Sequence, residues 1–201
     1  MITVRLAVLA GCLAFVLAGC ASPPTADVDA VTAALDAAGQ AGAADYAPES
    51  WAAAQDANSQ LQAELKAQEE KFALTRSYAK TRELVASAKA AADKAAQDAA
   101  TGKEQARLEA TQLIAEAQAA VEEAKALLDK APRGKGSQAD IEAMKTDLAG
   151  TETALAEANS ALAAGEYLQA KAKAEAVKTT ATTVKSSVEQ AQQAVKAARS
   201  R

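Results

Sequence analysis

Alanine dominates this chain and limits the kind of core that it can build. It makes up about 29% of the 201 residues, whereas aromatic residues make up 3%. Most of the apolar atoms are therefore methyl groups. Alanine has the highest intrinsic helix propensity, and small side chains make good contacts only where helix axes approach closely. The composition therefore predicts an all-α fold of long, closely packed helices, with disorder as the main alternative.

Apolar residues recur at intervals of three and four along three stretches, the spacing that places them on one face of a helix. We expect these faces to form the core of an elongated, antiparallel coiled-coil helical bundle. Within 138–164 the intervals of seven form a heptad seam. The expected core positions are Ala106, Ala110, Leu113, Ala117, Ala120, Ala124 and Leu127; Ile141, Leu148, Leu155 and Leu162; and Val177, Ala181, Val184, Val188, Ala191 and Val195.

Proline and glycine divide the sequence into segments. We expect a signal peptide at 1–19, a lipidated Cys and tether at 20–26, an N-terminal helical region at 27–131, a loop at 132–137 and a C-terminal helical hairpin at 138–201. Within 27–131, a short helix is expected to end near Gly39. The sequence after Pro48 allows one very long helix or two to three shorter ones, with candidate breaks at 68–71 and 101–102.

The first twenty residues have the layout of a secretory signal peptide. Arg5 precedes an apolar run that closes on Leu17-Ala18-Gly19-Cys20. This string resembles the lipobox of bacterial lipoproteins, which implies cleavage between Gly19 and Cys20 and lipidation of Cys20. The same four letters end at Cys12, but too few apolar residues precede them for export. An uncut transmembrane anchor is the alternative, although the run is shorter than the about 20 residues that span a bilayer.

The lipobox resemblance also implies a location in the cell envelope. In bacteria that sort lipoproteins, Asp after the lipidated Cys favours the inner membrane, whereas this chain has Ala21. We therefore expect a lipid anchor on the periplasmic face of the outer membrane, or on the outside of a single membrane. Because each buried methylene contributes about 0.8 kcal/mol, two or three acyl chains would hold the protein permanently.

The residues that most catalytic and metal sites need are missing from the mature chain, 20–201. It has no His, and its only Cys is Cys20. Disulfides, His or Cys metal sites and Cys-His or Ser-His-Asp catalysis are thereby excluded. The adjacent carboxylates Glu69–Glu70 and Glu122–Glu123 point about 100° apart on a helix and are interpreted as solvated faces. We expect no enzyme activity, catalytic residue, metal, cofactor or nucleic-acid partner.

Charge is uneven along the chain. Residues 20–70 carry nine acidic side chains and one basic, whereas 166–201 carry seven basic and three acidic. One interpretation is that the last helix packs beside the first long helix, with flanking ion pairs that select the partner. The other is that the basic end meets an anionic surface of the envelope.

The string Gly42-Ala43-Ala44-Asp45-Tyr46-Ala47-Pro48-Glu49 resembles the signature of an uncharacterised family of alanine-rich bacterial envelope lipoproteins. In that family the string opens an Ala-rich helix, and a Gly-Asp/Glu-Tyr turn and a second Ala-rich helix follow. Gly165-Glu166-Tyr167 matches the turn far downstream, whereas the place next to the signature reads Glu70-Lys71-Phe72. This suggests an internal duplication in which Phe72 and Tyr167 are equivalent. The resemblance carries no known activity.

The plan of the chain is also similar to the murein lipoprotein, in which an Ala-rich coiled coil follows a lipidated Cys. That family attaches to the cell wall through a C-terminal Lys, whereas this chain ends at Arg201. Covalent attachment to the wall is therefore not expected, and non-covalent contact with it is left open.

Tyr46 and Trp51 are candidate interaction residues, because they flank Pro48 in a chain with few aromatics. They either pin the short N-terminal helix onto the longer ones or form an exposed patch that binds a partner. For the whole protein we expect a lipid-anchored envelope lipoprotein that acts as a spacer, scaffold or protein-binding module, with a protein partner or self-association through its helices. The alternative is a periplasmic accessory or binding subunit of an envelope transport or secretion complex.

Overall fold

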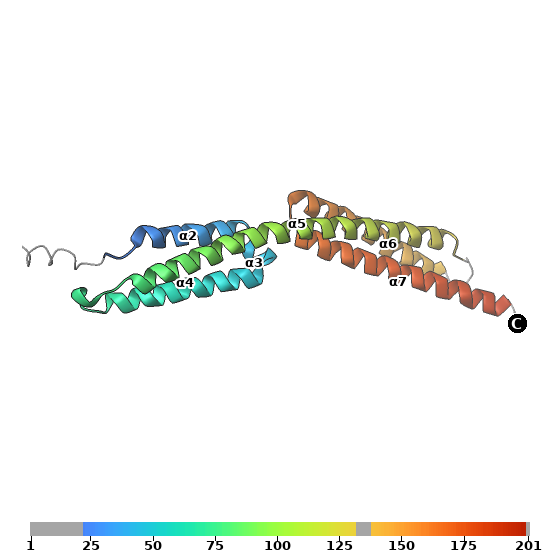
Figure 1. Cartoon of the computed structure of the whole chain (residues 1–201). Coiled ribbons are helices and arrows are strands. Elements are labelled where there is room, and N and C mark those ends of the chain that lie inside the picture. The colour runs from blue at the N-terminus through green and yellow to red at the C-terminus, as the bar shows by residue number, and fades with distance from the viewer. Residues whose placement is uncertain (1–21, 132–137, 200–201) are drawn as a thin grey trace, which may run out of the picture. The chain divides into compact units, whose positions relative to one another are not determined.

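The computed structural model describes residues 22–131 and 138–199. Over these residues the chain forms six α-helices and no strand, so the fold is all-α, as the composition predicts. The helices are α2 (Thr25–Gln40), α3 (Ala43–Tyr46), α4 (Pro48–Glu69), α5 (Ala79–Asp129), α6 (Gln138–Ala164) and α7 (Tyr167–Arg199), and a short 3-10 turn, η2 (Ala73–Thr75), lies between α4 and α5 (Figure 1).

The helices form two compact units that divide inside α5, between Gly102 and Lys103. Unit 1 contains α2, α3, α4 and the first part of α5, and unit 2 contains the rest of α5 with α6 and α7. The sequence instead places a division at 132–137, which lies outside the described residues. One helix serves both units because its stripe of small and apolar side chains continues through Gly102. The buried members of this stripe are Ala88, Ala92, Ala95, Ala99, Ala106, Ala110, Ile114, Ala117, Val121, Ala124 and Leu128.

The core of unit 1 is built largely from methyl groups. One cluster joins α2, α3, α4 and α5, and its six buried members are all alanine: Ala38, Ala43, Ala54, Ala92, Ala95 and Ala99. A second cluster contains Val31, Leu61, Val85 and Ala88. In Figure 1 α2, α4 and the first part of α5 lie side by side. The close approach that the composition requires is thus present in unit 1.

The core of unit 2 uses most of the stripe positions that the sequence indicates on α6 and α7. On α5 the large buried side chains are Ile114, Val121 and Leu128, whereas the expected Leu113, Ala120 and Leu127 are partly buried. Ile141 and Leu148 of α6 are buried, whereas Leu155 and Leu162 pack against the same cluster and are partly buried. On α7 the buried positions include Val177, Ala181, Val184 and Val188. Since Leu155 is only partly buried, the middle of the heptad seam is less enclosed than an ideal seam would be.

The structure settles how residues 48–131 are divided. A break follows Glu69, at the first of the two candidate positions, so that α4 and α5 are separate helices. At Thr101–Gly102 the helix continues without a break. At the other end, α2 begins at Thr25 and so includes the last two residues of the expected tether.

The turns use the backbone features that glycine and proline provide. Pro48 stands at the start of α4, where its missing amide N–H is not needed. Gly165 has a φ of 81° at the end of α6, a left-handed conformation that favours glycine. Gly165 and Phe72 therefore both belong to connections between consecutive long helices, one in each unit.

Candidate functional site

The predicted lipidation site lies outside the described residues. Gly19 and Cys20 precede Ser22, where the described chain begins. Pro23 and Pro24 follow, and the backbone N–H groups of Asp27 and Val28 both donate to the carbonyl oxygen of Pro24. The first helix of the described residues, α2, therefore begins five residues after Cys20.

Gly42 and Tyr46 form a tight corner between α2 and α4. Gly42 has a φ of 83°, and its carbonyl oxygen accepts from the backbone N–H of Tyr46 at 2.9 Å. A Cβ at position 42 would lie 3.0 Å from Cδ2 of Tyr46. Glycine is required here for its backbone conformation and also because the Tyr46 ring covers it.

Trp51 lies in the first turn of α4 and is partly buried. Its side chain packs against the alanine cluster of unit 1, together with Leu35 and Ala34 of α2. A Cβ built on Gly39 would lie 3.9 Å from Cη2 of Trp51, an ordinary van der Waals contact. Tyr46 and Trp51 thus both contact residues of the α2–α4 corner within unit 1.

Helix α5 passes unusually close to the same corner. A Cβ at Gly102 would lie 2.2 Å from the backbone oxygen of Tyr46 and 3.1 Å from its carbonyl carbon. Neither atom belongs to a flexible side chain, so they move only if the backbone moves. Gly102 therefore allows the backbones to touch. The sequence analysis named it as a candidate helix break because glycine costs about 1 kcal/mol in a helix. A glycine in a helix gives no sequence signal of a close contact.

A ladder of ion pairs joins α5 to α7 in unit 2. Lys171 pairs with Glu109 at 2.6 Å, Lys178 with Glu116 at 2.6 Å and Lys185 with Glu123 at 2.7 Å. Each pair is separated by 62 residues, so the two helices run in the same direction with a constant register. The sequence signal for this ladder is that its lysines and its glutamates each recur every seven residues. The sequence analysis did not use this spacing. The partner carboxylates lie at 109–123 and not in the acidic segment 20–70.

The ion pairs of the ladder shift the pKa values of their carboxyl groups. The Lys171 ammonium, and then the Gln105 amide, lower the pKa of the Glu109 carboxyl below its usual value. Lys178 and Gln112 lower the pKa of Glu116 in the same way. Such partly exposed pairs contribute little stability each, so their main effect is to fix which residues face one another.

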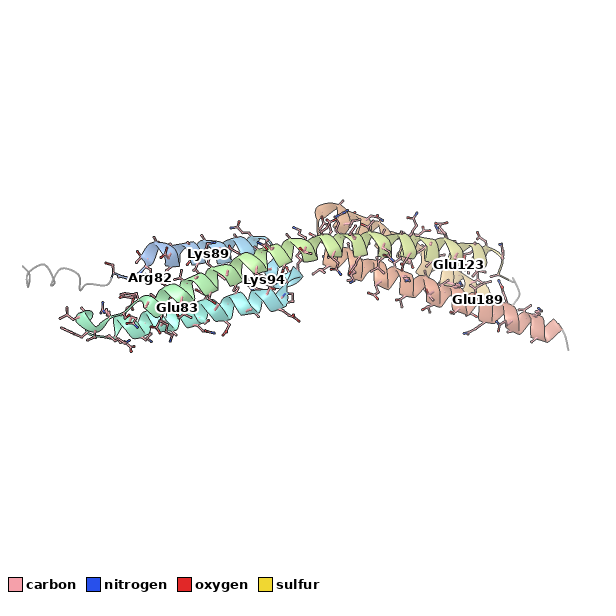
Figure 2. The ribbon with its side chains drawn as sticks, in the orientation of Figure 1. Arg82, Glu83, Lys89, Lys94, Glu123 and Glu189 are labelled. Carbon is pink, nitrogen blue, oxygen red and sulfur yellow. The ribbon has the colours of Figure 1, made fainter. Side chains whose placement is uncertain are left out.

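The third ion pair of the ladder, Lys185–Glu123, has a further charged residue nearby. The Glu123 carboxylate raises the pKa of the Lys185 ammonium, and Glu189 adds a smaller effect in the same direction. Figure 2 shows Glu123 on α5 and Glu189 on α7 in this part of unit 2. In unit 1, Asp98 accepts from Lys94 and Ser50, and these bonds lower the pKa of its carboxyl.

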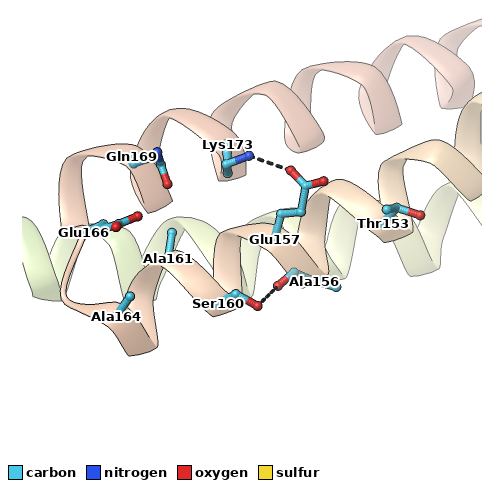
Figure 3. A pocket seen from close by; sticks show the side chains of 9 residues that line it. All are labelled: Thr153, Ala156, Glu157, Ser160, Ala161, Ala164, Glu166, Gln169 and Lys173. Carbon is cyan, nitrogen blue, oxygen red and sulfur yellow. Dashed lines mark hydrogen bonds and ion pairs between the residues drawn. The ribbon is translucent and has the colours of Figure 1, made fainter.

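An open hollow of about 520 Å³ lies between α6 and α7 near Gly165 (Figure 3). The Lys173 ammonium and the Glu157 carboxylate pair across it at 2.5 Å, and the Ser160 hydroxyl donates to the Ala156 carbonyl oxygen at 3.0 Å. The Ser160 hydroxyl therefore bonds to the backbone of its own helix and not to a side chain. The remaining lining is Thr153, Ala161, Ala164, Glu166 and Gln169.

Within 22–131 and 138–199, no cluster of three or more Asp, Glu, His or Cys side chains is placed to hold a metal ion. No helix in the same ranges is long and apolar enough to cross a membrane. The adjacent carboxylates Glu122 and Glu123 have different partners, since Glu122 pairs with Lys125 and Glu123 with Lys185.

One surface feature was missed by the sequence analysis. Phe72 and Leu74, in the connection between α4 and α5, expose 72% and 71% of their surface. Their signal in the sequence was an aromatic and a leucine that belong to neither of the flanking helical stripes. Phe72 was considered only as the counterpart of Tyr167.

Comparison with known proteins gives no relative for this chain: no family model, no curated protein and no solved structure matches it.

Proposed function

We propose that this protein is a lipid-anchored lipoprotein of the bacterial cell envelope that acts as a structural spacer or scaffold. The observation that carries the proposal is the lipobox-like string Leu17–Cys20 at the end of a signal-peptide layout. The start of α2 only five residues after Cys20 supports it, since the helical part would then be held close to the membrane. With Ala21 after the lipidated Cys, the proposed location is the periplasmic face of the outer membrane.

The helical architecture supports a mechanical role. Helix α5 continues for 51 residues without a break and contributes to both units. The alanine cluster of unit 1 and the α5–α7 ladder of unit 2 each hold helices in a fixed register. We propose that the units are elongated, antiparallel coiled-coil bundles. Such bundles suit a spacer or scaffold because they resist bending and because their helices do not slide past one another.

The proposed partners follow from the same features. The acyl chains on Cys20 contact the membrane, and charged helix faces such as those of α6 and α7 are available to a protein partner or a second copy. The cell wall is a further candidate for non-covalent contact. A catalytic role is not proposed for the α6–α7 hollow, where the Lys173 and Glu157 side chains pair with each other and the Ser160 hydroxyl bonds to the backbone.

The proposal is tested by lipid labelling in a bacterium that processes lipoproteins. Cells that express the full chain are fed an alkyne fatty acid, and the labelled protein is followed by gel shift and membrane fractionation. We expect native chain and Cys12→Ala to carry label and to fractionate with the membrane, and Cys20→Ala to carry none. Label that persists in Cys20→Ala and disappears in Cys12→Ala would move the anchor, and no label in any chain would refute it.

A further inference from the structure

We propose that the connection between α4 and α5, residues 70–78, is a second membrane contact that inserts Phe72 and Leu74 into the surface of the lipid bilayer. This proposal rests on the lipid anchor at Cys20. The loop would touch the same leaflet as the acyl chains, so that unit 1 is held at two points and takes up a defined orientation on the membrane.

The first reason is the exposure of the two side chains. Phe72 and Leu74 are the most exposed large hydrophobic residues of the part of the chain that the structure describes, and only one residue separates them. Tyr78, a few residues further along the same connection, is 3% exposed. The connection therefore buries one aromatic side chain and presents another to the outside.

The second reason is that the loop has a fixed shape. The Arg76 guanidinium donates through Nη2 to the Glu69 carbonyl oxygen at 2.9 Å and through Nε to the Lys71 carbonyl oxygen at 3.1 Å. Thr75 Oγ1 donates to the Phe72 carbonyl oxygen at 2.8 Å. These bonds satisfy the Glu69 carbonyl group at the end of α4 and two carbonyl groups of the loop, which would otherwise need water. The polar side chains thus face the loop backbone while the two apolar side chains remain exposed.

The buried Gln68 ties both ends of the loop together. Its Oε1 accepts from the Ser77 backbone N–H at 3.0 Å, and its Nε2 donates to Glu64 at 2.6 Å. A buried polar side chain with both ends of its amide bonded holds the backbone firmly. Insertion would therefore cost little ordering entropy, because the loop is already ordered.

The third reason is position. Pro23, Thr25 and Val28, at the start of the described chain, line one hollow together with Leu65 and Glu69 at the end of α4. The tether thus enters unit 1 beside the α4–α5 connection (Figure 1). Cys20 is two residues before Ser22, and two residues span at most about 7 Å in any conformation. The acyl chains are therefore bound to the same end of unit 1 as Phe72 and Leu74.

The loop has no net charge that would attract it to a charged membrane surface, so its contact with lipid depends on its apolar side chains. From Glu69 to Arg76 there are two acidic and two basic side chains, so the net charge is zero. Apolar burial beside an existing acyl anchor is then the main contribution, and binding is expected to be insensitive to salt. The aromatic ring of Phe72 and the leucine suit the boundary between headgroups and acyl chains.

The test uses tryptophan as a reporter in the full mature chain, purified with its lipid and reconstituted into phosphatidylethanolamine–phosphatidylglycerol vesicles with brominated acyl chains. The reporters are Phe72→Trp and Leu74→Trp, each combined with Trp51→Phe. The native chain is the matched control, because Trp51 lies about 27 Å from Glu69 along α4. We expect both reporters to shift to shorter wavelength and to lose most of their emission to bromine, and Trp51 to lose little.

Each other outcome has a separate meaning. Failure of the chain to float with the vesicles would refute the lipid anchor itself. Floating chains whose reporters emit as in water and remain unquenched would overturn the loop insertion alone. Equal quenching of Trp51 and the reporters would mean that unit 1 lies flat, which also overturns it. A blue shift without bromine quenching would assign the loop to a second copy of the chain.

Discussion

Gly102→Ala is expected to destabilise unit 1, although alanine is normally the better helix residue. In an ordinary helix this substitution gains about 1 kcal/mol of stability. Here the added Cβ would lie 2.2 Å from the backbone oxygen of Tyr46, more than 1 Å inside a favourable contact. Overpacking of this kind costs about 1–3 kcal/mol. Because only backbone movement relieves it, we expect the upper part of that range and a net loss of about 1–2 kcal/mol.

Gly150→Ala is the matched control. Gly150 lies in α6, and a Cβ there would have no neighbour within 4 Å. We expect this variant to stabilise unit 2 by about 1 kcal/mol. The same chemical change thus has opposite signs at the two positions, and the difference comes entirely from the distance to Tyr46.

Urea unfolding separates the two effects. Trp51 is the only tryptophan, so its fluorescence reports on unit 1, whereas circular dichroism at 222 nm reports on all helices. With a slope of about 2 kcal/mol/M, Gly102→Ala should lower the fluorescence midpoint by about 0.5–1 M. Gly150→Ala should leave that midpoint unchanged and raise the circular dichroism transition of unit 2. A fluorescence midpoint that rises in Gly102→Ala would refute the close approach of α5 to the corner.

Two further outcomes are expected. Thr81 is fully buried and its Oγ1 has no hydrogen-bond partner among the described residues, so Thr81→Val should raise the free energy of unfolding of unit 1 by about 1 kcal/mol, measured by Trp51 fluorescence. Thr101→Val removes an exposed hydroxyl bonded to the Gln97 carbonyl oxygen and should not raise the free energy of unfolding. Equal increases in the two variants would contradict the role given to the buried Thr81 hydroxyl. Glu109 and Glu116 have pKa values lowered from the usual 4.5, so their contribution is complete above that pH and is lost as pH falls through their folded-state values. Glu109→Gln combined with Glu116→Gln should make the stability of unit 2 less dependent on pH below 4.5, followed by circular dichroism. An unchanged pH dependence in the double variant would refute the role of the ladder.

The helix stripes could be predicted because their spacing is local. Val177, Ala181, Val184 and Val188 lie on one face of any helix that contains them, and all four are buried in the structure. Partial burial of Leu155 could not be predicted in this way, because it depends on how closely a neighbouring helix approaches at that level. The fold class follows from the sequence, and the degree of burial does not.

The candidate sites also differ in whether the sequence alone could reveal them. Cys20 is a sequence prediction that needs no fold, since the processing machinery reads a linear string. The ladder, the Tyr46–Gly102 contact and the exposed Phe72–Leu74 loop each join residues or surfaces that the chain brings together only on folding. Of these, only the ladder has a repeat in the sequence, with three lysines and three glutamates at intervals of seven.

The sequence by itself determined that this chain is helical, that its core is rich in small side chains and that residues 21–201 contain neither His nor Cys. These properties depend on composition and on spacing along one helix. Only the tertiary structure decided that α5 is shared by two units, that Gly102 marks a close contact and not a break, and that Phe72 is exposed while Tyr78 is buried. The physical reason is that each of these depends on distances between segments far apart in the chain, which a core of methyl groups allows to become very short.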